Sequence, residues 1–397
     1  MINFSSFFTI CFSLFLIPVG FAKSFNLLEN NLFDSDIIRG LAGWDTVYVS
    51  GEGTGTAKGE QFRFYNRTGN ENNLIVHFSG GGICWDYDSA SQPITMVDAI
   101  AVEAFGNEVV TGCKQELWTE LIPVGLGGLF ESIGYNPFRG WNVVFIPNTT
   151  GDFHIGKNPE KIYLKKNGVN QFEMIEFGHN GYNNTVATLQ WVFKNYDHPR
   201  KIIVSGDSAG SMGSLYWARA FSYRYPNSKI YQLSDSIYLN KQAFNNIFLK
   251  SWNVDIAKEF SVTPDDNIVA TAFLSYLKKE NRNTNMKHLH INTLYDDVLI
   301  GINSTLSGKK KNNKQRKEWS KGMLKTTHEL KSSKLNYEFF ISNYRPNEEG
   351  YNPHTSVLLQ TRYYLHHHKG TPVWEWLKLN IVDDESFSVG EEFLEYR

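Results

Sequence analysis

The sequence predicts an α/β fold: one domain with a mostly parallel central sheet, flanked by helices and carrying insertions. Short apolar runs typical of buried strands recur along the chain, at 73–78, 141–147, 201–205, 229–234, 288–292 and 335–342. Segments with helical spacing stand between or after these runs, at 181–196, 211–225, 241–280, 309–330 and 373–381. Strands that alternate with helices are typical of a parallel sheet covered on both faces. No internal repeat or low-complexity linker divides the chain, so a single domain is the simplest interpretation.

Three further segments complete the predicted order of elements. Residues 61–65 alternate as a half-buried strand does. Residues 95–105 are expected to be helical. Residues 116–135 are glycine-rich and irregular, which suggests a lid or an insertion that borders a pocket.

The composition is that of a large globular domain. Of the 397 residues, 41% are hydrophobic and 15% aromatic, enough to build an extensive core. The net charge of −2 gives no general attraction to nucleic acid or to an anionic membrane. The basic run at 309–317 is expected to be the solvated start of a helix. We expect a monomer that binds neither nucleic acid nor any cofactor.

The first 22 residues predict a secretory signal peptide. The apolar run at 7–21 has the right length, and Gly20 and Ala22 supply the small residues that a signal peptidase reads. We therefore expect cleavage after Ala22, a mature domain of residues 23–397, a secreted or periplasmic location and no stable membrane insertion. No lysine or arginine precedes the run, so an uncleaved N-terminal anchor is the alternative.

The cysteines suggest one disulfide. Cys11 lies in the predicted signal peptide, which leaves Cys84 and Cys113 in the mature chain. An even number of cysteines in an exported protein favours a pair, and two free thiols are the alternative.

The segment 206–210 reads Gly-Asp-Ser-Ala-Gly and lies between a predicted strand and a predicted helix. This is the context of a nucleophile elbow, in which a serine stands on a sharp turn and small neighbours avoid a steric clash. Ser208 is therefore the candidate nucleophile, and an ordinary turn that contains a serine is the alternative. A serine nucleophile needs a base within hydrogen-bond reach, and that base needs an orienting acid.

An acid and a histidine follow the serine in the chain order of α/β-hydrolases. Asp296 comes just after the 288–292 strand, and His354 lies in a turn-rich loop after the 335–342 strand. Ligands bind at the carboxyl ends of such strands. Asp297 and Asp235 are alternative acids, because each also follows a strand. The histidines at 366–368 follow no strand directly and are expected to form a solvated surface cluster.

Backbone donors for an oxyanion are also predicted. Residues 80–82 are three glycines at the end of the 73–78 strand, where the main chain can approach a substrate carbonyl closely. The candidate donors are the N–H groups of Gly81, Gly82 and Ala209, the last being the residue after the nucleophile. A plain glycine turn is the alternative.

Four polar or aromatic residues are candidates for contact with substrate. Asp152 and His154 follow the 141–147 strand and could bind a metal or a substrate. No further ligands stand at suitable spacing, so we expect no metal. His179 precedes a predicted helix, where capping and pocket lining are both open, and Trp85 follows the glycine run.

Several separated blocks, in this order, resemble the pectin acetylesterase family. The blocks lie at 79–85 (S-G-G-G-I-C-W), 136–144 (N-P-F-R-G-W-N-V-V), 150–156 (T-G-D-F-H-I-G), 181–185 (G-Y-N-N-T), 206–210, 295–296, 350–354 and 370–377. The resemblance runs from about residue 40 to 385. The chain departs from the family pattern at three positions. Thr149 stands where a cysteine is common, Leu299 where a glutamine is common, and Asp207 where a smaller residue is usual.

The resemblance implies an α/β-hydrolase fold and a serine esterase without a cofactor. Ser208 is then the nucleophile, His354 the base and Asp296 the orienting acid, with Gly81, Gly82 and Ala209 around the oxyanion. The expected substrate is an O-acetylated polysaccharide such as pectin. The alternatives are longer acyl esters on lipid or protein, as in the family's Notum branch, a carbohydrate-binding or acyl-binding protein with a silent triad, and acyl transfer to a sugar.

Overall fold

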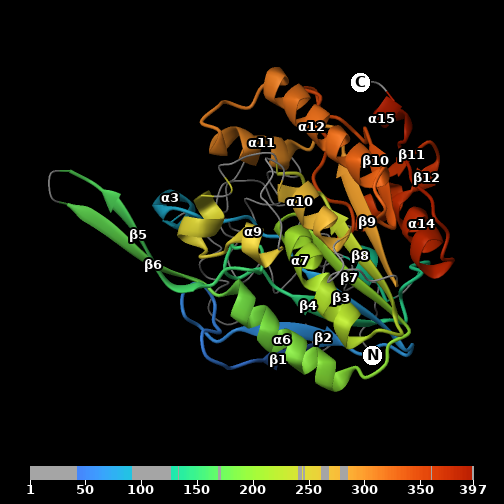
Figure 1. Ribbon diagram of the computed structural model, residues 1–397, viewed down its shortest axis with the longest axis horizontal. Coiled ribbons are helices and arrows are strands. Elements are labelled where there is room, and N and C mark those ends of the chain that lie inside the picture. The colour runs from blue at the N-terminus through green and yellow to red at the C-terminus, as the bar shows by residue number, and fades with distance from the viewer. Residues whose placement is uncertain are drawn as a thin grey trace, which may run out of the picture.

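A computed structural model describes most of the chain from residue 43 onwards: 43–91, 127–132, 134–168, 171–239, 244, 246–260, 268–277, 285–358 and 360–395. Its centre is an eight-stranded sheet with the order β1-β2-β4-β3-β7-β8-β9-β10 (Figure 1). The strands are β1 (Asp45–Tyr48), β2 (Arg63–Arg67), β3 (Asn73–Phe78), β4 (Asn142–Ile146), β7 (Lys201–Asp207), β8 (Lys229–Asp235), β9 (Met286–Thr293) and β10 (Tyr337–Ser342).

From β4 across to β10 every neighbouring pair of strands is parallel. Only β1 and β2 add antiparallel pairs, at the edge next to β4. The predicted mostly parallel sheet is therefore confirmed. Because parallel strands point the same way, their carboxyl ends share one edge of the sheet.

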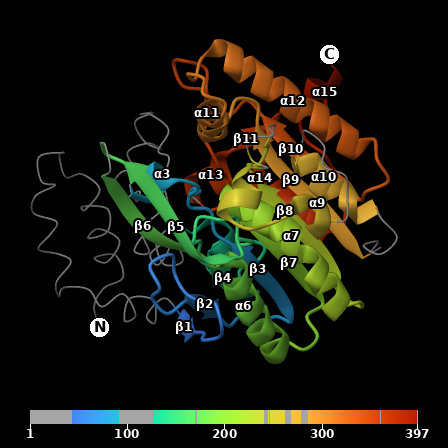
Figure 2. The same ribbon diagram turned by 60° about the vertical axis from the view of Figure 1, so that its left-hand side comes forward.

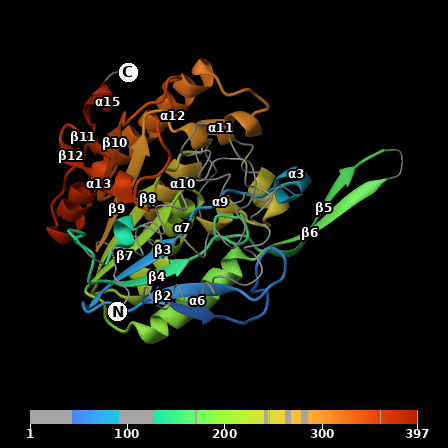
Figure 3. The ribbon, with the colours of Figure 1, turned by 180° about the vertical axis from the view of Figure 1, so that it is seen from behind.

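Helices cover both faces of the sheet. One face carries α6 (Gly181–Asn195), α7 (Ala209–Arg224), α9 (Ile256–Glu259), α10 (Ile268–Leu274), α11 (Asp297–Leu306) and α12 (Asn313–Lys331). The other carries α13 (Gln360–Leu365) and α14 (Val373–Leu377), seen from behind in Figure 3. The helices α11 and α12 lie together beyond β9 and β10 (Figure 2). Short helices α3 (Tyr87–Ser91) and α15 (Glu392–Glu395) complete the set described here.

Successive residues of the central strands enter different cores. Leu74 and Val76 of β3 pack under α6 and α7, whereas Ile75 faces the α13–α14 side. All of these side chains are fully buried. Burial on both faces explains why the central strands are continuous apolar runs rather than alternating ones.

A β-hairpin projects from the body as a separate two-stranded sheet (Figures 1 and 3). It consists of β5 (Asn158–Lys166) and β6 (Phe172–His179). One face packs against α3 through Tyr163, Phe177 and Tyr87. The other face exposes large apolar side chains, namely Ile162, Leu164, Phe172 and Met174. The sequence did not predict this hairpin.

Several predicted segments differ from the structure or fall outside it. The 373–381 helix is α-helical only to Leu377 and continues as a π-helical turn over Lys378–Val382. The 241–280 stretch contains a π-helical turn (Ile247–Ser251), α9, α10 and a 3₁₀ turn (Ser275–Leu277). The predicted signal peptide, the 95–105 helix and most of the 116–135 insertion lie outside the described residues. Within the described residues, no helix combines the length and apolarity needed to cross a membrane.

Candidate active site

Ser208 stands on the turn between β7 and α7, at the carboxyl edge of the sheet. Its backbone has φ 50° and ψ −121°, a strained conformation for a residue with a side chain. Two residues before the serine and two residues after it, the turn has room only for glycine. A Cβ atom on Gly206 would lie 2.0 Å from the carbonyl oxygen of Gly210, and one on Gly210 would lie 1.9 Å from that of Phe78. This is the geometry of a nucleophile elbow.

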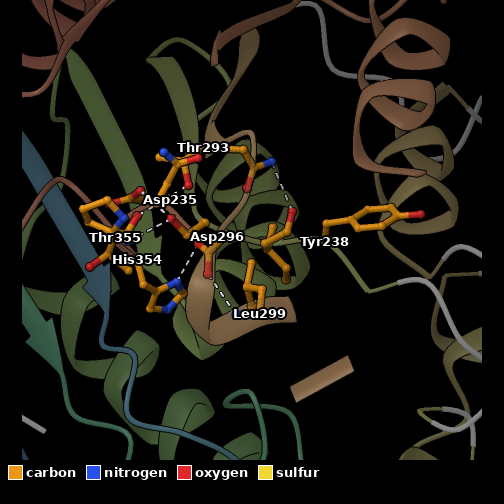
Figure 4. Close-up of polar contacts among 12 residues, drawn as sticks. Asp235, Tyr238, Thr293, Asp296, Leu299, His354 and Thr355 are labelled. Carbon is orange, nitrogen blue, oxygen red and sulfur yellow. Dashed lines mark hydrogen bonds and ion pairs between the residues drawn. The ribbon is translucent and has the colours of Figure 1, made fainter. Parts of the chain in front are cut away.

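The structure brings Asp296 and His354 into contact (Figure 4). Nδ1 of His354 lies 2.8 Å from Oδ2 of Asp296. The other oxygen, Oδ1, accepts the N–H of Leu299 at 2.8 Å and so caps α11. Asp296 is fully buried and His354 is 8% exposed. Because an ionised carboxylate only accepts hydrogen bonds, Nδ1 carries the proton and Nε2 is the basic nitrogen of the ring.

Asn352 joins the two loops that carry this pair. Its N–H donates to the carbonyl of Tyr295 at 2.8 Å, and its carbonyl accepts the N–H of Asp297 at 3.1 Å. Its side-chain oxygen accepts the N–H of Tyr295 at 2.8 Å. Asp297 points elsewhere, since its carboxylate accepts from Nζ of Lys311 at 2.6 Å. Of the two adjacent acids, Asp296 is the one that contacts the histidine.

The glycine loop after β3 is fixed at three points. The N–H of Gly80 donates to Oδ1 of Asp207 at 2.8 Å. The carbonyl of Ser79 accepts from Nε2 of His154 at 2.8 Å, and the carbonyl of Gly82 accepts from Nδ2 of Asn148 at 3.1 Å. The loop lies against the elbow, because a Cβ atom on Gly80 would lie 3.0 Å from that of Ser208.

The amides of Gly81 and Gly82 are held differently from that of Gly80. In the described part of the chain, their N–H groups donate to no protein acceptor. Their φ angles are 150° and 83°, which glycine adopts readily. Ala209 is the first residue of α7, so its N–H has no partner within the helix. These are the three amides that the sequence predicts around an oxyanion.

A buried pair that the sequence analysis missed lies behind the glycine loop. Nε2 of His77 lies 3.0 Å from Oδ1 of Asp207, and Nδ1 lies 2.9 Å from Oγ of Ser205. The rings of Phe130 and Phe145 enclose the imidazole. The available signal was His77 itself, a histidine among the apolar residues of the 73–78 run.

Asp152, His154 and His179 lie in the interior, with their polar groups bonded to the protein. The Asp152 carboxylate accepts the N–H of Gly181 at 2.9 Å and that of His154 at 3.1 Å. Burial raises the pKa of Asp152 to about 6 and lowers the pKa of His154 to about 4 and of His179 to about 3. Trp85 is only partly buried. Contact of these four residues with substrate stays a prediction.

The predicted surface cluster of three histidines is wrong for its first member. His366 is 1% exposed, and its two ring nitrogens contact the hydroxyls of Ser342 and Ser356. Its ring stacks on Tyr344, and burial lowers its pKa to about 3. His367 is exposed, and His368 is an ion-pair partner of Glu392.

Cys84 is fully buried and disulfide-bonded. Cys113 lies outside the described residues, so its pairing with Cys84 stays a prediction. No group of three or more histidine, cysteine, aspartate or glutamate side chains is arranged to hold a metal within the described ranges.

A mostly parallel sheet with an elbow serine at its carboxyl edge defines an α/β-hydrolase-like protein. The family model named Pectinacetylesterase matches residues 59–337, and the chain belongs to this family. A search of the curated proteins finds no match. Membership of the family implies a carboxylic ester hydrolase.

Proposed function

We propose that this protein is a secreted serine esterase that removes O-acetyl groups from a polysaccharide such as pectin. The observation that carries the proposal is the 2.8 Å contact between His354 and Asp296, on the sheet edge where the elbow serine stands. The family description supports the acetylated polysaccharide as the substrate class.

The first half of the reaction forms an acyl-enzyme. Nε2 of His354 takes the proton from Oγ of Ser208 as that oxygen attacks the acetyl carbonyl carbon. Asp296 holds the imidazole in the required tautomer and stabilises the imidazolium that forms. The N–H groups of Gly81, Gly82 and Ala209 donate to the tetrahedral oxyanion. The imidazolium returns its proton to the sugar oxygen, the C–O bond breaks and the alcohol leaves.

The second half releases acetate. His354 removes a proton from a water molecule, which attacks the acyl carbon of the ester on Ser208. The oxyanion forms again on the same amides, and its collapse breaks the bond to Ser208 Oγ, which takes the proton back. The residues of this chain thus supply nucleophile, base and oxyanion donors.

We also propose a positioning role for Asp152, His154 and His179, beside the predicted contact with substrate. His154 holds the carbonyl of Ser79 and thereby the start of the glycine loop. Asp152 holds the amides of His154 and Gly181. Nδ1 of His179 lies 3.0 Å from the carbonyl of Thr150, which fixes the neighbouring turn.

Acetate release from acetylated pectin and acetylated xylan tests the proposal. Ser208→Ala should abolish release, whereas Ser222→Ala, a serine on the same helix that bonds to Arg219, should behave as wild type. Retained release in Ser208→Ala would end the serine mechanism. A p-nitrophenyl ester series then reports chain length. Cleavage of these esters without release from either polysaccharide would move the substrate toward longer acyl esters on lipid or protein.

Secretion has its own test. Protein recovered from outside the cell should begin at Lys23, as N-terminal sequencing would reveal. A chain that keeps residues 1–22 and stays cell-bound would support the uncleaved anchor instead.

A further inference from the structure

Asp235, the last residue of β8, is a fully buried carboxylate that the reaction above does not use. Its Oδ2 accepts the N–H of Ser356 at 2.6 Å and that of Val357 at 2.8 Å. The hydroxyl of its neighbour Ser236 accepts the N–H of Thr355 at 3.0 Å. The end of β8 therefore binds three consecutive amides, all directly after His354 in the chain.

The main chain of Asp235 binds the nucleophile elbow. Its carbonyl accepts the N–H of Ser208 and the hydroxyl of Ser211, each at 2.8 Å. Asp235 thus contacts the segment that carries the nucleophile with its backbone and the segment that carries the base with its side chain. Figure 4 shows Asp235 beside Thr355, the residue that follows His354.

We propose that Asp235 is a positioning residue of the esterase site, which sets the place of the His354 imidazole relative to Ser208. This inference rests on the proposed function. Proton transfer needs the base within hydrogen-bond reach of the serine oxygen, and a misplacement of about 1 Å can cost about 10²-fold in rate. Asp235 fixes that spacing because it binds both segments at once.

Other contacts hold the same segment without reaching the elbow. Arg362 donates to the carbonyls of His354 and Thr355, and His366 contacts the hydroxyl of Ser356. They resist local unfolding of the segment, but they do not tie it to Ser208. Loss of the Asp235 carboxylate should therefore leave the segment folded and displaced relative to the nucleophile.

A carboxylate suits this place better than a neutral acceptor. Charge-assisted bonds to two amides are stronger than neutral ones. The charged groups facing Asp235 are Asp207 from β7 and His354 from its own loop. Burial raises the pKa of Asp235 to about 6, and the two amides and His354 oppose that rise, whereas Asp207 adds to it. By reciprocity, ionised Asp235 stabilises the imidazolium of His354.

The kinetics of Asp235→Ala and Asp235→Asn on p-nitrophenyl acetate, measured from pH 5 to 9, test the inference. Asp235→Ala should lower kcat/KM by about 10²-fold, chiefly in kcat. Asparagine keeps an oxygen for the two amides, so Asp235→Asn should stay within about 10-fold of wild type. The acid limb of the pH profile of kcat/KM should move to lower pH in Asp235→Asn, because this variant lacks the negative charge that stabilises the imidazolium of His354.

His288→Gln is the matched control. His288 is also buried and hydrogen-bonded, to Gln232, but it lies near the start of β9, at the opposite edge of the sheet. The His288→Gln substitution should lower the melting temperature and leave kcat/KM of the folded protein unchanged. A folded Asp235→Ala enzyme with wild-type kcat/KM would overturn the inference. So would an Asp235→Asn enzyme that is as impaired as Asp235→Ala and keeps the wild-type acid limb.

Two measurements separate this inference from the proposed function. A fluorophosphonate should label Ser208 in the wild type, and an unlabelled Ser208 would refute the serine mechanism itself. The role of Asp235 can still be measured in Ser208→Ala protein, through the downfield NMR signal of the His354 Nδ1 proton. Loss of this signal in His354→Gln assigns it. That signal should shift or broaden in Asp235→Ala. An unchanged signal would mean that Asp235 does not position the histidine.

Discussion

Replacing Asp296 by asparagine tests the candidate site at a single atom. Asp296 accepts the N–H of Leu299 with Oδ1 and the Nδ1 proton of His354 with Oδ2. Asparagine has one accepting oxygen, and the amide of Leu299 can only donate, so the oxygen stays there and the NH₂ group faces His354. An NH₂ donor next to Nδ1 forces the ring proton onto Nε2. Nε2 then cannot take the proton from Ser208.

The size of the loss follows from the geometry. The same tautomer error in serine proteases lowers kcat by about 10⁴-fold, or about 5.5 kcal/mol of transition-state stabilisation. Asp296 is fully buried, so water has no access to replace the lost acceptor. We expect a loss of about 10³ to 10⁴-fold in kcat with little change in KM.

Asp297→Asn is the control one residue away. Its carboxylate pairs with Lys311 at 2.6 Å, and both side chains are about one-fifth exposed. A partly exposed pair contributes at most about 1 kcal/mol to stability. We expect wild-type kcat and a small drop in melting temperature. Hydrolysis of p-nitrophenyl acetate measures both variants. An Asp296→Asn enzyme that keeps more than a tenth of the activity, or an Asp297→Asn enzyme that loses most of it, would refute the assignment.

Three further predictions follow from other parts of the structure. Gly210→Ala places a Cβ atom 1.9 Å from the carbonyl oxygen of Phe78, and we expect a cost of about 3 kcal/mol or more, read from the denaturant midpoint. Asp207→Leu leaves the Gly80 amide and His77 without their acceptor, and kcat should fall by about 10²-fold together with the affinity for a boronic acid inhibitor, whereas Asp207→Asn should retain most of both. Stability should fall as the pH drops from 7.5 to 5, because burial lowers the pKa of five histidines to about 3 or 4: His154, His179, His288, His290 and His366. The unfolded chain takes up their protons near pH 6.5 and the folded chain does not, which favours unfolding on acidification. Asp152 and Asp235, whose pKa values burial raises to about 6, act in the opposite direction between about pH 4 and 6 but are fewer. Urea midpoints at pH 7.5, 6 and 5 measure the sum, and a rise on acidification would contradict it.

The sheet and its edge could be predicted because burial on both faces leaves a plain signal. Runs such as 73–78 and 201–205 are mostly apolar without a regular alternation, and candidate residues follow them closely. The hairpin of β5 and β6 gave no such signal. Its outer face carries Leu164 and Phe172, so neither strand alternates cleanly between apolar and polar residues.

Contacts between distant segments could not be predicted from local pattern. His366 can be buried because the hydroxyls of Ser342 and Ser356 contact its two ring nitrogens. His77 and Asp207 lie on neighbouring strands although 130 positions separate them in the chain. The spacing of two residues in the sequence carries no information on such contacts, because the packing of the whole fold brings them together.

Three adjacent parallel strands each lead into an aspartate, and this arrangement explains how the site is held. Asp207 ends β7, Asp235 ends β8 and Asp296 follows β9. Each carboxylate binds groups outside its own strand: the glycine loop, the segment after His354, and the imidazole of His354. Carboxylates this close repel one another, and Asp207 accordingly contributes to the raised pKa of Asp235. Donors from neighbouring loops offset that repulsion, so the loops must close on the sheet edge for the charges to be tolerated. The stability of the edge and the geometry of the site therefore depend on the same hydrogen bonds.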